Sequence, residues 1–166
     1  MSILQVAQLG HPVLRQVAKD VPEELFGTEK LDGFIEDMID SMEDHGGVGL
    51  AAPQVHESIR VIAINLEEDN DQEEEVKARF VRKIFINPIL IPVSDEIVEG
   101  WEGCLSLKDL RGLVPRYRAV RLTVLDRNGS PIELETDTFL SIVLQHEIDH
   151  LNGLLLVDRV EDTSLL

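Results

Sequence analysis

The segment FLSIVLQHEIDHLN, residues 139–152, constrains the fold more than any other part of the chain. Its first half is apolar on nearly every side, so the pattern predicts a helix that lies inside the protein. Asp137 or Thr138 can cap the start of this helix, and Gly153 is typical of a helix end. We therefore expect the rest of the chain to surround it.

The remaining segments predict one more helix and several strands. Apolar residues recur at helical spacing between Thr28 and His45, which predicts an amphipathic helix near the N-terminus. Pro88 and Pro92 are expected to break the strands in which they lie. The expected strands are residues 59–65, KIFINPILIPV (83–93), DEIVEGW (95–101) and a hairpin around Asn128 and Gly129. Strands around a buried C-terminal helix, with a second helix near the start, predict an α+β fold.

Length and charge limit the classes of protein that fit. The 166 residues contain no repeat or linker, so we expect a single catalytic domain over residues 1–166. The net charge of −17 makes nucleic acid and anionic membranes unexpected ligands. Seven acidic residues between positions 67 and 75 predict a solvated loop. With no membrane-span-sized apolar run, no leader pattern and one cysteine, a cytoplasmic location is expected.

The predicted C-terminal helix carries the strongest candidate for chemistry. His146 and His150 are four residues apart and share a helix face, and Glu147 can reach the edge of an ion that both imidazoles bind. In this arrangement a metal ion activates water and a glutamate takes the proton. The alternative is a polar stripe on a surface helix. The apolar residues before His146 disfavour it, because buried imidazoles and carboxylates need partners.

Two histidines leave a catalytic ion short of one protein ligand. Downstream of His150 the only glutamate is Glu161. Upstream, Cys104 follows Gly103 in an apolar run that indicates a strand, and a thiolate is a good ligand for zinc-like metals. A lone cysteine can equally be a small buried apolar residue. The residues alone leave both interpretations of Cys104 open.

Three short motifs stand in order along the chain: GVGLAAPQ (47–54), EGCLS (102–106) and HEIDH (146–150). With these motifs the sequence resembles the peptide deformylase family, over a stretch from about LGHPVLR to LLLVDRV. The resemblance implies a metal-dependent hydrolase that removes the formyl group from N-formylmethionine at the start of new polypeptides. Its substrates would be N-formyl-methionyl peptides, including nascent chains at the ribosome.

The resemblance also implies roles for individual residues. Cys104, His146 and His150 match the metal ligands, and Glu147 matches the general base. The expected reaction is attack of a metal-activated water on the formyl carbon, with Glu147 removing the proton of the water. Gln54 and the backbone N–H of Leu105 match the donors that hold the formyl oxygen. On ligand type alone the ion is zinc, whereas the resemblance implies Fe²⁺, with Zn²⁺, Ni²⁺ or Co²⁺ able to substitute.

Several residues are expected to bind the peptide. Phe139, Ile142 and Val143 share the helix face of His146 and predict an apolar wall suited to a methionine side chain, although each can equally be plain core. By resemblance, Val48 closes another side of this pocket and the backbone of Gly49 pairs with the substrate.

An arginine cluster follows the EGCLS motif. By resemblance, Arg111 lies near the substrate and Arg116 pairs with Asp149 of the helix, while Arg118 and Arg121 are expected to be solvated. Many family members carry a longer basic C-terminal helix associated with ribosome docking. The segment DRVEDTSLL has one arginine and three acids, so this docking helix is expected to be absent.

Two other functions fit parts of the pattern. A metallopeptidase that cuts internal bonds is disfavoured by the upstream cysteine and the short chain. A binding module with a purely structural metal would need a fourth protein ligand. His11, His45 and His56 are the remaining histidines, and we expect them to be solvated or capping residues.

Overall fold

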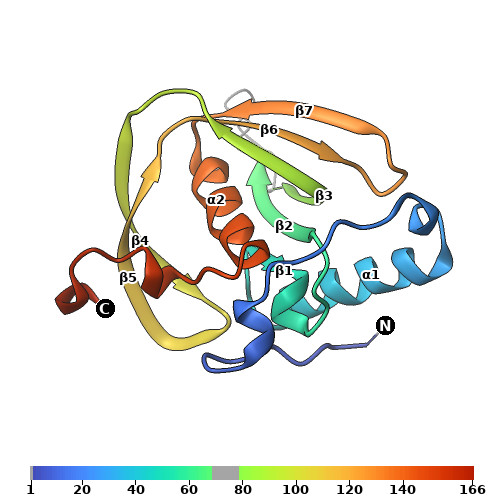
Figure 1. Ribbon diagram of the computed structural model, residues 1–166, viewed down its shortest axis with the longest axis horizontal. Coiled ribbons are helices and arrows are strands. Elements are labelled where there is room, and N and C mark those ends of the chain that lie inside the picture. Colours follow the sequence, from blue (N-terminus) through green and yellow to red (C-terminus); the bar gives the residue numbers. More distant parts are fainter. Residues whose placement is uncertain (1, 69–78) are drawn as a thin grey trace.

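Helix α2 (Phe139–Leu151) lies between two antiparallel sheets in the computed structural model, which describes residues 2–68 and 79–166 (Figure 1). The larger sheet has the strand order β1-β2-β3-β6-β7 and the smaller one pairs β4 with β5. The strands are β1 (Gly49–Ala51), β2 (Val61–Glu68), β3 (Arg79–Pro92), β4 (Ile97–Cys104), β5 (Leu107–Tyr117), β6 (Val120–Leu125) and β7 (Pro131–Thr136). The predicted α+β architecture is confirmed.

Helix α2 begins and ends close to the predicted residues. The hydroxyl of Thr138 accepts a hydrogen bond from the N–H of Leu140, and Gly153 follows the helix with a φ of 73°. Its apolar residues pack against β2, β3 and β6 around Ile62 and Leu122. The prediction that the first half is buried was wrong for Phe139. This residue is 60% exposed because the first turn reaches past the core to the mouth of a pocket.

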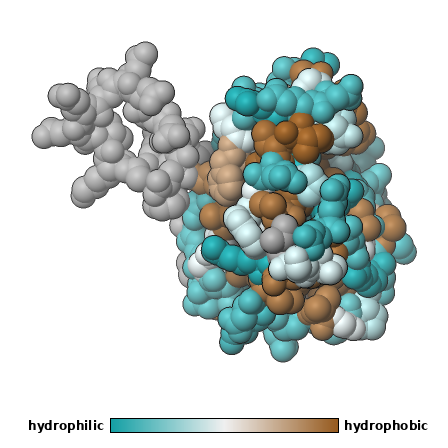
Figure 2. Space-filling view, turned by 90° about the vertical axis from the view of Figure 1, so that its left-hand side faces the viewer, coloured by the Kyte–Doolittle hydropathy of each residue, from teal (hydrophilic) through white to brown (hydrophobic). Residues whose placement is uncertain are grey.

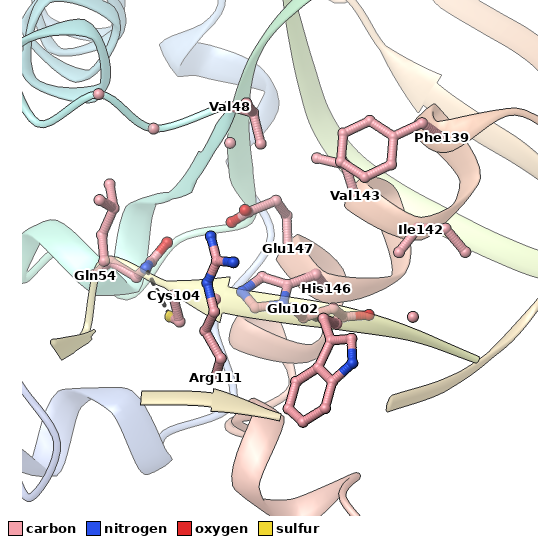
Figure 3. Close-up of a pocket in the computed structure, with 17 residues that line it drawn as sticks. Val48, Gln54, Glu102, Cys104, Arg111, Phe139, Ile142, Val143, His146 and Glu147 are labelled. Carbon is pink, nitrogen blue, oxygen red and sulfur yellow. Dashed lines mark hydrogen bonds and ion pairs between the residues drawn. The ribbon is translucent and has the colours of Figure 1, made fainter. Parts of the chain in front are cut away.

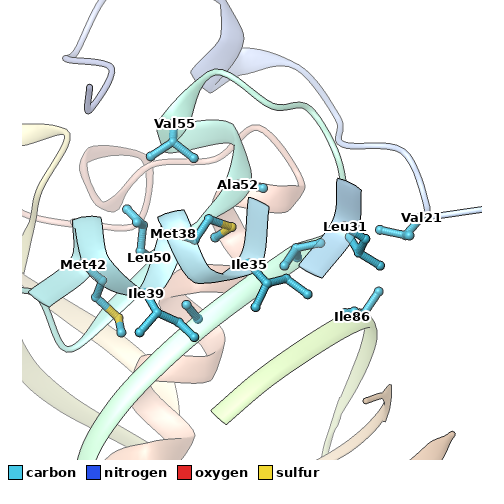
Figure 4. Close-up of a cluster of buried hydrophobic side chains, with 12 residues drawn as sticks. Val21, Leu31, Ile35, Met38, Ile39, Met42, Leu50, Ala52, Val55 and Ile86 are labelled. Atoms are coloured by element: carbon cyan, nitrogen blue, oxygen red, sulfur yellow. The ribbon is translucent and has the colours of Figure 1, made fainter. Parts of the chain in front are cut away.

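Helix α1 (Glu29–Asp44) is the predicted amphipathic helix, and the hydroxyl of Thr28 caps its first turn. Its apolar face packs on β1 and β2, as Figure 4 shows for the buried side chains of Ile35, Met38 and Met42. Each of these three is fully buried, and complete burial of such a side chain contributes roughly 1.5–3 kcal/mol to stability. The helix therefore fixes the sheet edge formed by β1.

Pro88 does not break its strand, contrary to the prediction. Strand β3 continues through it, and the pairing of β3 with β6 shifts register between Ile86 and Ile89. Asn87 adopts a φ of 51°, and its side-chain amide bonds both backbone groups of Val21. This bulge accommodates the missing N–H of proline without ending the ladder. Pro92 ends the strand as expected.

Strand β5 follows a tight turn after Cys104 and pairs with β4 along its whole length. The sequence pattern did not predict it, because Gly112 and Pro115 interrupt the alternation of the segment. Gly112 is needed there: a Cβ would lie 2.5 Å from Val160, whose segment packs closely on the strand. The two short strands thus hold Cys104 against α2 from the side opposite the larger sheet.

The surface agrees with the charged composition of the chain. Hydrophilic residues cover most of the face shown in Figure 2, with smaller hydrophobic patches between them. In the described part of the chain, no helix is both long and apolar enough to cross a membrane. Of the predicted acidic loop at 67–75, the first two residues belong to β2 and the others lie outside the described residues.

Candidate metal centre and its pocket

Three potential metal ligands meet where β4 ends against α2. One donor atom each from Cys104, His146 and His150 lie within 4.8 Å of one another. The sulfur of Cys104 is 3.2 Å from Nε2 of His150, and the two imidazole rings stand nearly perpendicular with centroids 5.1 Å apart. One thiolate and two imidazoles form a donor set for zinc-like divalent ions. The residues therefore fit a single ion.

The two histidines differ in how the protein holds them. Nδ1 of His146 lies 2.8 Å from a carboxylate oxygen of Glu102, which orients the ring and leaves Nε2 available. Nδ1 of His150 is buried, and no described residue bonds it. His150 is only 1% exposed and therefore relies on packing for its orientation.

Glu102 belongs to a buried network of charges behind His146. Arg116 donates two hydrogen bonds to Glu102, at 2.8 and 2.9 Å, and a third to Asp149 at 2.6 Å. Asp149 also accepts two hydrogen bonds from Arg159, so the predicted pairing of Arg116 with Asp149 exists within a larger cluster. The arginine ties β5 to both β4 and α2. Arg118 and Arg121 are about half exposed and pair only with surface glutamates.

Glu147 is buried beside the potential ligands. Its Oε2 has no hydrogen-bond partner among the described residues. A Cβ added to Gly49 would lie 2.4 Å from Oε1 of Glu147, so the absence of a side chain on β1 makes room for this carboxylate. Burial raises the pKa of Glu147 to about 7, although the nearby His146 opposes the rise.

The imidazoles titrate in opposite directions. Burial alone would lower the pKa of His146, but interactions with the Cys104 sulfur and Glu102 outweigh it and raise the pKa to about 10. Burial lowers the pKa of His150 well below its ordinary value, and the charge of His146 adds to this. Because an ion competes with the proton for an imidazole nitrogen, metal binding at this site is expected to release protons.

Gln54 and Leu105 lie next to Cys104. The amide oxygen of Gln54 accepts the N–H of Ala51 at 2.8 Å, which fixes the orientation of its NH₂ group. That group donates to Ser106 at 3.2 Å and points toward the sulfur of Cys104 at 3.6 Å (Figure 3). The remaining histidines are exposed: His11 and His45 cap helices, and the ring of His56 packs on that of His11.

A pocket of about 500 Å³ opens above this centre. Figure 3 shows Phe139, Ile142 and Val143 along one side, Val48 across from Phe139 at the top of the view, and Arg111 below. The lining contains every residue predicted for the site except the buried His150; these are Val48, Gly49, Gln54, Cys104, Leu105, Arg111, Phe139, Ile142, Val143, His146 and Glu147.

Glu102 and Trp101 also line the pocket and were not predicted. Alternation along a strand could have suggested Glu102, since a residue two positions before Cys104 lies on the same face of a regular strand. Trp101 is 59% exposed, although it contributes to the pocket lining. No spacing rule in the sequence assigns it to the pocket.

Comparison with known proteins identifies the family. The sequence model of the polypeptide deformylases matches residues 3–165. The chain belongs to the polypeptide deformylase family. It is 39% identical to peptide deformylase 2 of Pseudomonas putida, covering 96% of this chain and 89% of the relative. It is 43% identical to peptide deformylase 1 of Bordetella pertussis, covering 96% of this chain and 88% of the relative.

Solved peptide deformylases have the same fold. The Met-Ala-Ser-bound class I type b enzyme of Acinetobacter baumannii matches with a TM-score of 0.86 and 34% identity, over 96% of this chain and 99% of that chain. The Thermotoga maritima peptide deformylase matches with a TM-score of 0.83 and 32% identity, over 98% and 100%. Peptide deformylases are hydrolases that remove formyl groups from nascent polypeptides, so this chain is an enzyme of that class. The family implies one catalytic metal ion, for which the Cys104 cluster is a possible site.

Proposed function

We propose that this deformylase binds one divalent ion through Cys104, His146 and His150 and uses Glu147 as the general base for hydrolysis of the N-formylmethionyl amide. The observation that carries the proposal is the convergence of one sulfur and two ring nitrogens within 4.8 Å, beside a buried carboxylate oxygen that has no partner among the described residues. A structural site would leave such a carboxylate without a role, and its burial would cost free energy.

The ion at this centre is proposed to be Fe²⁺, which the family resemblance favours, with Zn²⁺, Ni²⁺ or Co²⁺ able to replace it. When bound, it supplies Lewis acidity to water and to the formyl oxygen. Glu102 keeps His146 in the tautomer whose Nε2 is a ligand, through the 2.8 Å contact with Nδ1.

Glu147 moves the proton in the proposed reaction. Its carboxylate takes a proton from the attacking water and returns it to the nitrogen of the leaving amine. The NH₂ group of Gln54 and the N–H of Leu105 donate to the formyl oxygen as negative charge develops on it. Gln54 is held for this task, because its carbonyl oxygen is already bonded by Ala51 at 2.8 Å.

The rest of the pocket suits a formylmethionyl peptide. The wall of Phe139, Ile142 and Val143 is apolar and borders His146, as a methionine side chain requires. Strand β1 is at the end of its sheet, so Gly49 is placed to add the substrate backbone as a further strand. The bound Met-Ala-Ser of the Acinetobacter baumannii structure supports a peptide of this kind as the ligand.

We propose a cytoplasmic enzyme of one domain that acts on nascent chains. Residues 154–166 are not proposed to contact ribosomal RNA, because Asp158, Glu161 and Asp162 outnumber Arg159, which Asp149 already engages. Co-sedimentation with ribosomes tests this point. Binding at physiological salt that is lost when residues 160–166 are removed would contradict it.

One experiment tests the chemistry. Protein purified without oxygen is incubated with formyl-Met-Ala-Ser and with acetyl-Met-Ala-Ser, and formate and metal content are measured. We expect formate only from the formyl peptide, loss of activity but not metal in Glu147→Ala, and loss of metal in Cys104→Ser. Glu99→Ala, an exposed site on β4, is the control. Cleavage of internal bonds without formate would favour a peptidase, and full activity of Glu147→Ala would refute the assignment of the base.

A further inference from the structure

Arg111 is an arginine without a counter-charge in a strongly acidic protein. Among the described residues, no carboxylate lies within ion-pair distance of it and no hydrogen bond holds its guanidinium. The seven other arginines whose side chains are described all have carboxylate partners; they are Arg15, Arg60, Arg116, Arg118, Arg121, Arg127 and Arg159. The chain has 32 acidic residues, so a shortage of carboxylates does not explain why Arg111 has no partner among the described residues; its location in the fold does.

The backbone directs Arg111 into the pocket. Arg111 pairs with Gly103 in the β4–β5 ladder, and its Cγ and Nε lie 3.8 Å from the place where a Gly103 side chain would begin. The stem therefore crosses the strand over a residue without a side chain. Figure 3 shows the guanidinium pointing into the centre of the pocket.

The pocket offers Arg111 no internal partner. Its lining holds two carboxylates, Glu102 and Glu147. Glu102 is occupied by Arg116 and His146, and Glu147 forms no ion pair with Arg111. Arg111 is the one lysine or arginine in the described lining. Its planar fork of donors is thus free to bind a carboxylate that arrives with the substrate.

We propose that Arg111 selects formylmethionyl peptides with an acidic side chain among the first residues after the methionine, by binding that side-chain carboxylate. The proposal rests on the deformylase function above and adds a determinant of substrate preference to it. Surface carboxylates of the protein repel an acidic peptide at long range, so the preference depends on this local contact.

Isosteric peptide pairs measure the preference. The substrates are C-terminally amidated, to remove the terminal carboxylate: formyl-Met-Asp-Ser and formyl-Met-Asn-Ser test the second position, and formyl-Met-Ala-Asp and formyl-Met-Ala-Asn test the third. We expect kcat/KM for Asp to exceed that for Asn by about 5-fold at one of these positions, which corresponds to about 1 kcal/mol for a solvent-accessible ion pair. The ratio should fall toward one as salt is raised.

Two variants assign the preference to Arg111. In Arg111→Gln the Asp/Asn ratio should fall to one or below. In Arg118→Gln, which alters an exposed arginine paired with Glu96, the ratio should stay as in the wild type. A ratio of one or less in the wild type at both positions, or an equal ratio in the wild type and Arg111→Gln, would overturn the proposal. An equal loss of activity by Arg111→Gln on all peptides would assign Arg111 to the peptide backbone and also overturn it.

Failure of this proposal is distinguishable from failure of the proposed function. Formate release from the amidated formyl-Met-Ala-Ser peptide reports the deformylase reaction alone. Activity on that peptide with no Asp/Asn difference would reject only the role of Arg111 in selection.

Discussion

The Nδ1 atom of His146 lies 2.8 Å from Oε2 of Glu102, and both groups are buried. The same carboxylate receives two hydrogen bonds from Arg116, which raise its acidity against the effect of burial: the pKa of Glu102 is lowered although burial alone would raise it. A charged acceptor therefore faces the ring nitrogen that does not point to the metal centre.

Replacing Glu102 with glutamine should weaken metal binding. An amide cannot accept from both Arg116 and His146 with a full negative charge, so the imidazole loses its orientation. We expect affinity for Zn²⁺ or Co²⁺ to fall by roughly 10- to 100-fold. Competition with a chromophoric chelator measures this, and Glu99→Gln on the same strand is the control. Unchanged affinity in Glu102→Gln would mean that packing alone orients His146.

A methyl group at Gly49 should disable Glu147 without unfolding the protein. The added Cβ would stand 2.4 Å from Oε1 of Glu147, so the carboxylate must leave its present position. We expect kcat for a formyl peptide to fall by roughly 100-fold or more, the scale of a lost general base. Gly100→Ala is a matched control, because Gly100 also lines the pocket but has open space at its Cβ position. Equal kcat values for the two variants would contradict this prediction.

Truncating Arg116 should destabilise the fold far more than truncating Arg118. Arg116→Ala leaves Glu102 and Asp149 buried without their shared cation, which costs about 3–5 kcal/mol. Arg118 is about half exposed with Glu96 as its partner, and its loss should cost less than about 1 kcal/mol. Urea unfolding monitored by circular dichroism measures the free energy of unfolding of both variants. A loss in Arg116→Ala as small as that in Arg118→Ala would show that the buried network adds little to stability.

The pKa of Glu147 predicts how the stability of the metal-free protein depends on pH. Burial raises this pKa from 4.5 to about 7. Between these values the folded state holds a proton that the unfolded chain has released, so the contribution of Glu147 to stability falls as pH rises. Relative to Glu147→Gln, the wild type should lose stability between about pH 4.5 and about pH 7. Urea unfolding in the presence of a chelator measures the difference, and a difference independent of pH would contradict the assigned shift.

Local patterns were sufficient for much of the fold. The spacing of apolar residues predicted both helices, and Thr28 and Thr138 cap them as their short polar side chains suggest. The strand predicted at 59–65 corresponds to β2 (Val61–Glu68), and the hairpin around Gly129 is formed by β6 and β7. These features depend on neighbouring residues and on the burial of one face, so they are visible in the sequence.

Proline and glycine patterns were less informative. Pro88 predicted a strand end, but Asn87 forms a bulge tied to Val21, 66 residues away. Strand β5 was not predicted because Gly112 interrupts the alternation of apolar and polar residues. A glycine stands there because Val160 packs where a side chain would lie. Both outcomes depend on tertiary neighbours that no local pattern contains.

The sequence by itself determined that His146, Glu147 and His150 share a helix face, since helical periodicity is a local property. The residues alone did not determine the third metal ligand, and the resemblance of the motifs to the family indicated Cys104. Only the tertiary structure decided that β4 brings Cys104 to Nε2 of His150 and Glu102 to Nδ1 of His146. It also decided that Arg111 enters the pocket without a partner among the described residues. These two contacts of Cys104 and Glu102 join residues 46 and 44 positions apart, and their geometry comes from the packing of the two sheets around α2.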